Sequence, residues 1–171
     1  MPTIENYVEA VRNYYSSERP FGAVGVPELE FYQRLLDAST SGERSIVLGP
    51  PGSGKTTMLD HLTLSFALTG AAIPVFIPVR QYSTTLTVLI DRAIQRFTPT
   101  LDWDGMHLLA QQGPRLVFLI DAWDEAPPFF EQRITDELHA LLDSHPESSV
   151  VITSRRELRT DVSAGWARYI I

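Results

Sequence analysis

The strongest constraint on the fold of this chain is one glycine-rich segment that follows a short apolar run. Residues 49–56 read GPPGSGKT and fill every fixed position of the pattern G-x-x-x-x-G-K-[ST]. Glycines lack a Cβ and adopt positive φ, so successive backbone N–H groups of such a loop can converge on phosphate oxygens. Apolar residues 46–48 before it predict a strand, and apolar residues after it recur at helical spacing. The segment therefore predicts a phosphate-binding loop between a strand and a helix rather than an incidental glycine-rich turn.

This loop is expected to hold a nucleotide triphosphate and its metal ion. Lys55 would place its ammonium between the β- and γ-phosphates, and the Thr56 hydroxyl would bind Mg²⁺. The positive N-terminal end of the following helix would face the anion. The residues expected to bind the nucleotide are Gly49, Pro50, Pro51, Gly52, Ser53, Gly54, Lys55, Thr56 and Thr57.

Residues 116–121 predict a buried strand that ends in a metal-binding carboxylate. They read LVFLID, which is five apolar residues followed by Asp121. Gly113 and Pro114 precede the run and Pro127 follows it closely, so its length suits a strand better than a helix. Asp121 at the carboxyl end of a central strand would share Mg²⁺ with Thr56. The alternative is a surface aspartate that ends an ordinary core strand.

The acids that follow Asp121 carry further information. Residues 122–125 read AWDE, so the glutamate is displaced from the position directly after the metal aspartate that many P-loop ATPases use. In this respect the chain resembles the NACHT class of signal-transduction ATPases, in which a small residue such as Ala122 follows the aspartate. Trp123 stands where that class more usually has an aliphatic residue. The resemblance implies that Glu125 or Asp124 orients the attacking water, and Glu125 is the preferred choice.

A third segment, residues 150–155, reads VVITSR and predicts a buried strand with a polar end. It resembles the sensor strand of the NACHT class, which implies that Arg155 lies near the γ-phosphate and reports its presence. The choice of Arg155 over Arg156 rests on that resemblance. The alternative is a solvated basic turn after a strand.

Strand and helix patterns alternate along the chain, which predicts an α/β fold with parallel strands and right-handed crossovers. The prolines beside residues 75–77 place that strand toward a sheet edge. The resemblance implies the three-layer P-loop NTPase fold, a parallel sheet of about five strands in the order 5-1-4-3-2 flanked by helices. Residues 167–171 are the candidate fifth strand. Helices are expected within residues 4–15, 27–36, 57–66, 86–97, 106–109 and 134–142.

Two parts of the chain are expected: an N-terminal helix and linker over residues 1–22, and a P-loop NTPase domain over residues 23–171. The resemblance covers residues 43–171. NACHT proteins continue into a helical lid and a winged helix, so we expect this chain to be the core of a longer protein. A natural minimal protein is the alternative.

Composition excludes several classes of function. The chain has 171 residues with 14 basic and 21 acidic side chains, and a net charge of −7 argues against direct nucleic-acid binding. It has no cysteine, and its four histidines show no metal-ligand spacing. Residues 61–79 lack Asp, Glu, Lys and Arg, but Gly70, Pro74 and Pro78 argue against a membrane span. The N-terminus lacks the basic start and apolar core of a signal peptide, so we expect a cytoplasmic protein.

The leading functional prediction is a switch that binds ATP (or GTP) with Mg²⁺, hydrolyses it slowly, and controls assembly of a signalling or defence protein. Self-assembly is expected in the full-length protein. One alternative is a non-catalytic module that holds a nucleotide such as ADP, and another is a different P-loop ATPase of AAA-like type. The only asparagines lie before the loop, so the Asn-Lys-x-Asp guanine motif is absent, although this does not itself select adenine.

Phe129 and Phe130 follow a double proline and have two interpretations. They could form a partner-facing patch, because two adjacent aromatic residues cannot both point into one helix stripe. The favoured interpretation is that they anchor the loop onto the sheet.

Overall fold

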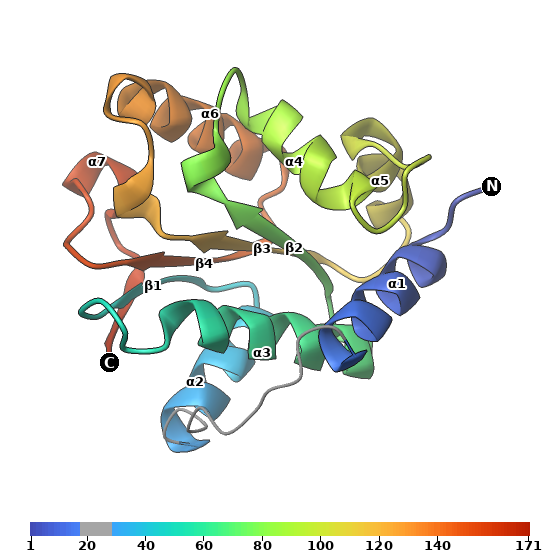
Figure 1. Ribbon diagram of the computed structural model, residues 1–171, viewed down its shortest axis with the longest axis horizontal. Coiled ribbons are helices and arrows are strands. Elements are labelled where there is room, and N and C mark those ends of the chain that lie inside the picture. Colours follow the sequence, from blue (N-terminus) through green and yellow to red (C-terminus); the bar gives the residue numbers. More distant parts are fainter. Residues whose placement is uncertain (18–28) are drawn as a thin grey trace.

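The computed structural model describes residues 1–17 and 29–171, and it shows one sheet between two layers of helices (Figure 1). The five strands are β1 (Arg44–Leu48), β2 (Ile73–Pro78), β3 (Leu116–Asp121), β4 (Ser149–Ser154) and β5 (Ala167–Ile170). All their pairings are parallel, and their order is β2-β3-β4-β1-β5. Counted from the other edge this is 5-1-4-3-2, which confirms the predicted order and fold class.

Apolar runs form these strands because helices cover both faces of the sheet. Every residue of β4 is buried, and so are the first five residues of β3. Pro74 and Pro78 lie in β2, which is an edge strand as the prolines predicted. β5 forms the opposite edge and confirms the predicted fifth strand.

The helices form two layers (Figure 1). α2 and α3 cover one face of the sheet, α4, α5 and α6 cover the other, and α1 lies beside α3 near the β2 edge. Among the residues that the structure describes, no helix is long and apolar enough to cross a membrane. The helices are α1 (Ile4–Ser17), α2 (Leu29–Thr40), α3 (Lys55–Thr69), α4 (Leu86–Gln95), α5 (Trp103–Ala110), α6 (Glu131–Ser144) and α7 (Thr160–Ser163).

Side chains of the central strands alternate between the two layers, as the two-residue period of a strand requires. Phe118 and Ile120 of β3 belong to the core beneath α4 and α6. Val117 and Leu119 of the same strand belong to the core beneath α3. This packing on both faces fixes the register of β3, and therefore the position at which its last residue, Asp121, emerges.

Helix α1 is tied to the sheet layer by specific contacts. Tyr7 is buried and its hydroxyl donates a 2.8 Å hydrogen bond to the carbonyl of Pro74 in β2. Arg12 donates from Nη2 to the carbonyl of Ala67 at 3.0 Å, near the C-terminal end of α3. A cation at this end of a helix also interacts favourably with the helix dipole. These contacts join α1 to the same body as the sheet.

The predicted linker lies partly within this first helix. Ser16 and Ser17 extend α1 beyond the predicted helix end at Tyr15. Residues 18–22, and the helix start expected at Pro27 and Glu28, lie outside the described residues. The predicted division of the chain after residue 22 therefore stays a prediction.

The two adjacent phenylalanines behave differently from each other. The ring of Phe130 is half-buried and packs against Tyr82, with the ring centroids 5.4 Å apart. Phe129 is 98% exposed. The anchoring interpretation therefore holds for Phe130 and fails for Phe129, because the short helical turn over residues 128–130 points the two side chains apart.

Candidate functional site

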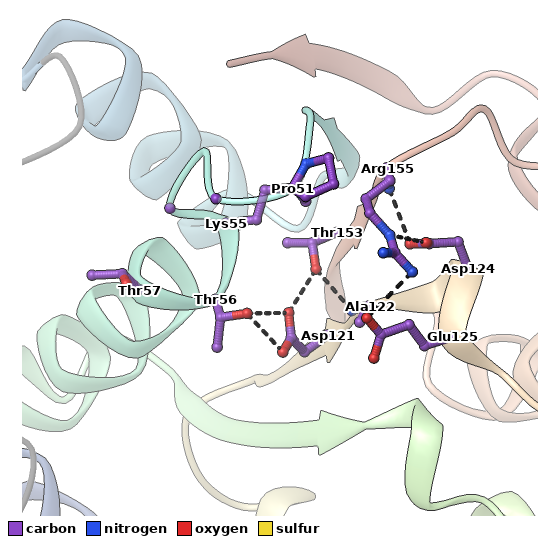
Figure 2. Close-up of a pocket in the computed structure, with 12 residues that line it drawn as sticks. Pro51, Lys55, Thr56, Thr57, Asp121, Ala122, Asp124, Glu125, Thr153 and Arg155 are labelled. Atoms are coloured by element: carbon purple, nitrogen blue, oxygen red, sulfur yellow. Dashed lines mark hydrogen bonds and ion pairs between the residues drawn. The ribbon is translucent and has the colours of Figure 1, made fainter.

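The carboxyl ends of three strands meet at one edge of the sheet and surround a hollow of about 390 Å³ (Figure 2). β1 leads into the glycine-rich loop, β3 ends at Asp121, and β4 ends at Ser154. The strand order thus brings together most of the site residues predicted from these three segments, whereas Gly49, Pro50 and Ser53 of the loop do not line the hollow. The residues that line the hollow are Pro51, Gly52, Gly54, Lys55, Thr56, Thr57, Asp121, Ala122, Asp124, Glu125, Thr153 and Arg155.

The loop adopts a conformation that its glycines make accessible. Gly54 has φ +88°, in the left-handed region that side chains disfavour, and α3 begins directly after it. At Gly49 an added Cβ would lie 2.6 Å from Ser53 Oγ and 2.8 Å from the carbonyl oxygen of Ile171, so no larger residue fits. No side chain caps the start of α3. The amide groups of its first turn are therefore available to an anion in the hollow.

Lys55 places a positive charge at the wall of this hollow. Its Nζ donates to the carbonyl oxygens of Gly49 at 2.7 Å and Pro50 at 2.8 Å, and lies 3.3 Å from Ser53 Oγ. Partial burial lowers the pKa of Lys55, whereas the nearby carboxylate of Asp124 acts in the opposite direction. The ammonium is thus held by its own loop at the wall of the hollow.

Thr56 and Asp121 meet although they lie 65 residues apart in the chain. The Thr56 hydroxyl lies 3.2 Å from Oδ1 and 3.0 Å from Oδ2 of Asp121 (Figure 2). Both groups supply hard oxygen atoms, the ligands that Mg²⁺ prefers. Across the described ranges, no group of three or more His, Cys, Asp or Glu side chains could hold a metal ion. Because it supplies oxygen atoms from two side chains, the pair fits Mg²⁺, which usually takes one or two protein ligands and completes its shell with water and phosphate.

The Asp124 carboxylate is committed to contacts within the protein. Its side chain is only 6% exposed. Oδ1 accepts hydrogen bonds from the backbone N–H of Arg155 at 3.0 Å and from Ser154 Oγ at 3.3 Å, and Oδ2 accepts from Arg155 Nε at 2.5 Å. Burial acts to raise the pKa of Asp124, but the hydrogen bonds and charge of Arg155 outweigh it and hold that pKa below its usual value. Asp124 thus anchors the end of β4.

Glu125 is the more accessible of the two acids. Its side chain is 37% exposed and lines the hollow, and its Oε1 lies 3.3 Å from Arg155 Nη2 in an ion pair (Figure 2). A partly exposed ion pair of this kind is weak and separates readily. The geometry therefore leaves Glu125 freer than Asp124 to contact a water molecule in the hollow.

Arg155 lies between the two acids and faces the hollow. Its hydrogen bond and ion pair with Asp124 raise its pKa further, so the guanidinium is always charged. Arg156 contacts the backbone carbonyl of Asp124 at 3.5 Å and does not line the hollow. Of the two arginines, Arg155 is therefore the one that lines the hollow, and its role toward a nucleotide stays a prediction from the family resemblance.

Two features of the site were not predicted. Ala122 adopts φ +56°, and among the described residues it is the only non-glycine with positive φ. Thr153, fully buried, contacts both Asp121 and the backbone of Ala122. A threonine near the end of a predicted strand was visible in the sequence, but its partners depend on β3 and β4 being neighbours.

Residues 43–169 match the family model of the NACHT domain. No curated protein matches the chain at a significant level. The fold is similar to the crystal structure of a DNA replication initiation factor, with 15% identity over 87% of this chain and 48% of that chain, and a TM-score of 0.56. It is also similar to Cdc6p from Pyrobaculum aerophilum, with 18% identity over 90% of this chain and 49% of that chain, and a TM-score of 0.51.

The chain thus spans about half the length of each of these two structures. At such low identity the likeness shows a shared fold and no more. The family match is of a different kind, because it covers well over half of the chain and includes residues 49–56, 121–125 and 150–155. The chain belongs to the NACHT domain family of P-loop NTPases.

Proposed function

We propose that this domain is a nucleotide-dependent switch that binds ATP with Mg²⁺, hydrolyses it slowly, and controls assembly of a longer signalling or defence protein. The observation that carries the proposal is the hollow of about 390 Å³, which unites the glycine-rich loop, the Thr56–Asp121 pair and Glu125. Membership of the NACHT family supports nucleotide binding in general. GTP is the alternative nucleotide, since none of these contacts reads the base.

In this proposal the loop residues hold the phosphates. The backbone N–H groups of Gly52 and of residues 54–57 would face the phosphate oxygens. Pro50 and Pro51 have no N–H, and the N–H groups of Gly49 and Ser53 donate to carbonyl groups of the protein. Lys55 would leave the carbonyls of Gly49 and Pro50 to meet the β- and γ-phosphates. Thr56 and Asp121 would hold Mg²⁺. When bound, the ion would neutralise charge that develops on the phosphates. A positive loop aimed at the reacting group stabilises the transition state more than the ground state.

Glu125 is proposed to orient the attacking water, and Arg155 to respond to the γ-phosphate. Glu125 lines the hollow and is partly exposed, so it can reach a water molecule without leaving a buried anion unpaired. Arg155 forms an ion pair with Glu125, with Nη2 3.3 Å from Oε1. A γ-phosphate would compete with Glu125 for the same guanidinium. Binding of triphosphate would then release Glu125 toward water.

Coupling to assembly is the least direct part of the proposal. It is supported by the family match, because the proposed switch role is one that the resemblance to the NACHT class implies. The proposal includes a cytoplasmic setting, where ATP and Mg²⁺ are supplied, and no direct contact with nucleic acid, in keeping with the net charge of −7.

The proposal is tested by measuring phosphate release from ATP by the wild type and by Glu125→Gln. The variant is expected to keep its affinity for ATP and to lose turnover at least 100-fold, because the amide cannot accept a proton from water. Full turnover by Glu125→Gln would remove Glu125 from the mechanism.

One observation favours the second candidate function, a non-catalytic module that holds a nucleotide. Glu125 is ion-paired with Arg155 in the structure, so hydrolysis requires that contact to open. A wild-type protein that binds ADP and ATP equally, and releases no phosphate from ATP, would favour this candidate over the switch.

A further inference from the structure

The hydroxyl of Thr153 lies where the ends of β3 and β4 meet. It donates to Asp121 Oδ1 at 2.8 Å and accepts from the backbone N–H of Ala122 at 2.9 Å (Figure 2). The residue is fully buried. A hydroxyl has one hydrogen to donate, so the contact with Asp121 commits its only donor. One side chain of β4 thus connects to the last residue of β3 and to the residue that follows it.

The contacts of the Thr153 hydroxyl join β3 to β4 at a point where the backbone hydrogen bonds between these two strands have ended. The pairing of β3 with β4 ends at Ile120 and Ile152, one residue before Asp121 and Thr153. Beyond that point the Thr153 side chain joins the two strands. The position of Asp121 relative to β4 therefore depends on a hydroxyl and not on backbone pairing alone.

The bend at Ala122 needs such support. Its φ of +56° and ψ of +54° lie in the left-handed region, which is unfavourable for alanine. The bend turns the chain from β3 into a short helical turn, in which the Glu125 N–H donates to the Ala122 carbonyl at 2.8 Å. By holding the Ala122 N–H, Thr153 stabilises the conformation that directs Glu125 toward the hollow.

The carboxylate of Asp121 is held from two sides. Thr153 binds Oδ1, while Thr56 contacts both Oδ1 and Oδ2. The Thr153 bond limits rotation of the carboxylate and leaves Oδ2 directed toward Thr56. Groups that orient a metal-binding carboxylate in this way commonly control metal affinity.

We propose that Thr153 is a positioning residue, which through one hydroxyl fixes both the carboxylate of Asp121 and the Ala122 bend that carries Glu125. The inference rests on the proposed function, because it concerns how the same site is held. Loss of the hydroxyl weakens the Mg²⁺-dependent part of triphosphate binding and leaves the phosphate loop unchanged.

The test compares Thr153→Val with Thr153→Ser in the full chain. Valine keeps the branched shape that suits a buried strand and removes the hydroxyl, whereas serine keeps the hydroxyl. The affinity for a fluorescent ATP analogue is measured across a range of Mg²⁺ concentrations. For Thr153→Val we expect affinity without Mg²⁺ within about twofold of wild type, and a Mg²⁺ requirement raised about 10- to 100-fold. For Thr153→Ser, both the affinity without Mg²⁺ and the Mg²⁺ requirement should stay within about threefold of wild type.

A second variant tests the bend separately. Phosphate release from ATP should also fall in Thr153→Val, because the bend that carries Glu125 loses its support. Glycine adopts the left-handed region freely, so adding Ala122→Gly should recover part of this phosphate release while the Mg²⁺ requirement stays raised. Absence of any recovery would refute the part of the inference that concerns Ala122.

The outcomes separate this inference from the proposed function. A wild type that binds no nucleotide overturns the proposed function and this inference with it. If wild type binds nucleotide in a Mg²⁺-dependent way and Thr153→Val shows the same Mg²⁺ dependence, the inference about Thr153 is overturned and the proposed function is not. Equal loss of affinity with and without Mg²⁺ in Thr153→Val would also overturn it, because that result indicates general damage to the fold.

Discussion

Asp124 and Glu125 are adjacent acids with different surroundings, and matched substitutions should separate them. Asp124→Asn and Glu125→Gln each exchange one carboxylate oxygen for an NH₂ group. At position 124 the amide has one acceptor oxygen for the backbone N–H and the Nε–H of Arg155, which both now bond to the carboxylate. One of these donors must then face an NH₂ group in a site where the side chain is 6% exposed. We therefore expect Asp124→Asn to destabilise the fold.

The size of this effect follows from the hydrogen bond that the amide can no longer accept. Removing an acceptor from a buried, charge-assisted hydrogen bond costs about 1–3 kcal/mol. For a domain of 171 residues, a loss of about 2 kcal/mol lowers Tm by roughly 4–8 °C. Glu125→Gln alters a side chain that is 37% exposed, and a surface ion pair is worth about 0–1 kcal/mol. Its Tm should change by less than about 2 °C.

The pH dependence of the Tm difference between wild type and Asp124→Asn tests the same reasoning. The folded state holds the pKa of Asp124 below its ordinary value of 3.8, so the stabilisation by its carboxylate is fully present above pH 3.8. It is lost as the pH falls through the lower, folded-state pKa. The Tm gap between wild type and Asp124→Asn should therefore be constant near neutral pH and narrow below pH 3.8.

Scanning calorimetry together with a phosphate-release assay measures both effects. The expected pattern is a lower Tm for Asp124→Asn, and an unchanged Tm with lost turnover for Glu125→Gln. Unchanged stability and lost turnover for Asp124→Asn, with full turnover for Glu125→Gln, would show that the roles of the two acids are exchanged and that the reasoning from their burial is wrong.

Two further predictions concern other parts of the fold. Phe130→Ala should lower the free energy of unfolding by about 1–2 kcal/mol because it removes a half-buried ring that packs against Tyr82. The matched Phe129→Ala removes an exposed ring and should change that free energy by less than about 0.5 kcal/mol. Equal effects of the two substitutions in chemical denaturation would contradict the packing described. Burial, and then the neighbouring His107, lower the pKa of His145 below 6.5, so the unfolded state binds more protons below that pH and stability should fall as the pH drops from 7 to 5.5. The stability of His145→Gln should fall less over this pH range. If its stability depends on pH as that of wild type does, His145 is not the cause of the fall.

The sequence alone predicts those parts of the candidate site that lie within one short segment. The loop over residues 49–56 combines its glycines, lysine and threonine in a fixed local pattern, so no tertiary contact is needed to identify it. The position of Asp121 at the end of a strand could be predicted because the sequence changes there from apolar to polar residues. The strand order came from the resemblance to the NACHT class, since pattern alone does not say which strands are neighbours.

Contacts between distant residues could not be predicted in this way. Asp124 and Arg155 pair across 31 residues of sequence, and only the adjacency of β3 and β4 shows that Asp124 is an anchor. The hydrogen bond between His107 and His145 spans 38 residues and joins α5 to the end of α6. Helix α7 has four residues, too few to display a helical period.

The central claim is that the loop and Lys55 capture a triphosphate beside a Mg²⁺ site, and titration calorimetry tests it most directly. ATP with Mg²⁺ is titrated into wild type and into Lys55→Ala, with Asp121→Asn as the variant that keeps the loop and weakens the metal site. We predict saturable binding at one site by wild type, a loss of at least tenfold in affinity for Lys55→Ala, and a loss for Asp121→Asn only when Mg²⁺ is present. Equal affinities for wild type and Lys55→Ala would contradict the account.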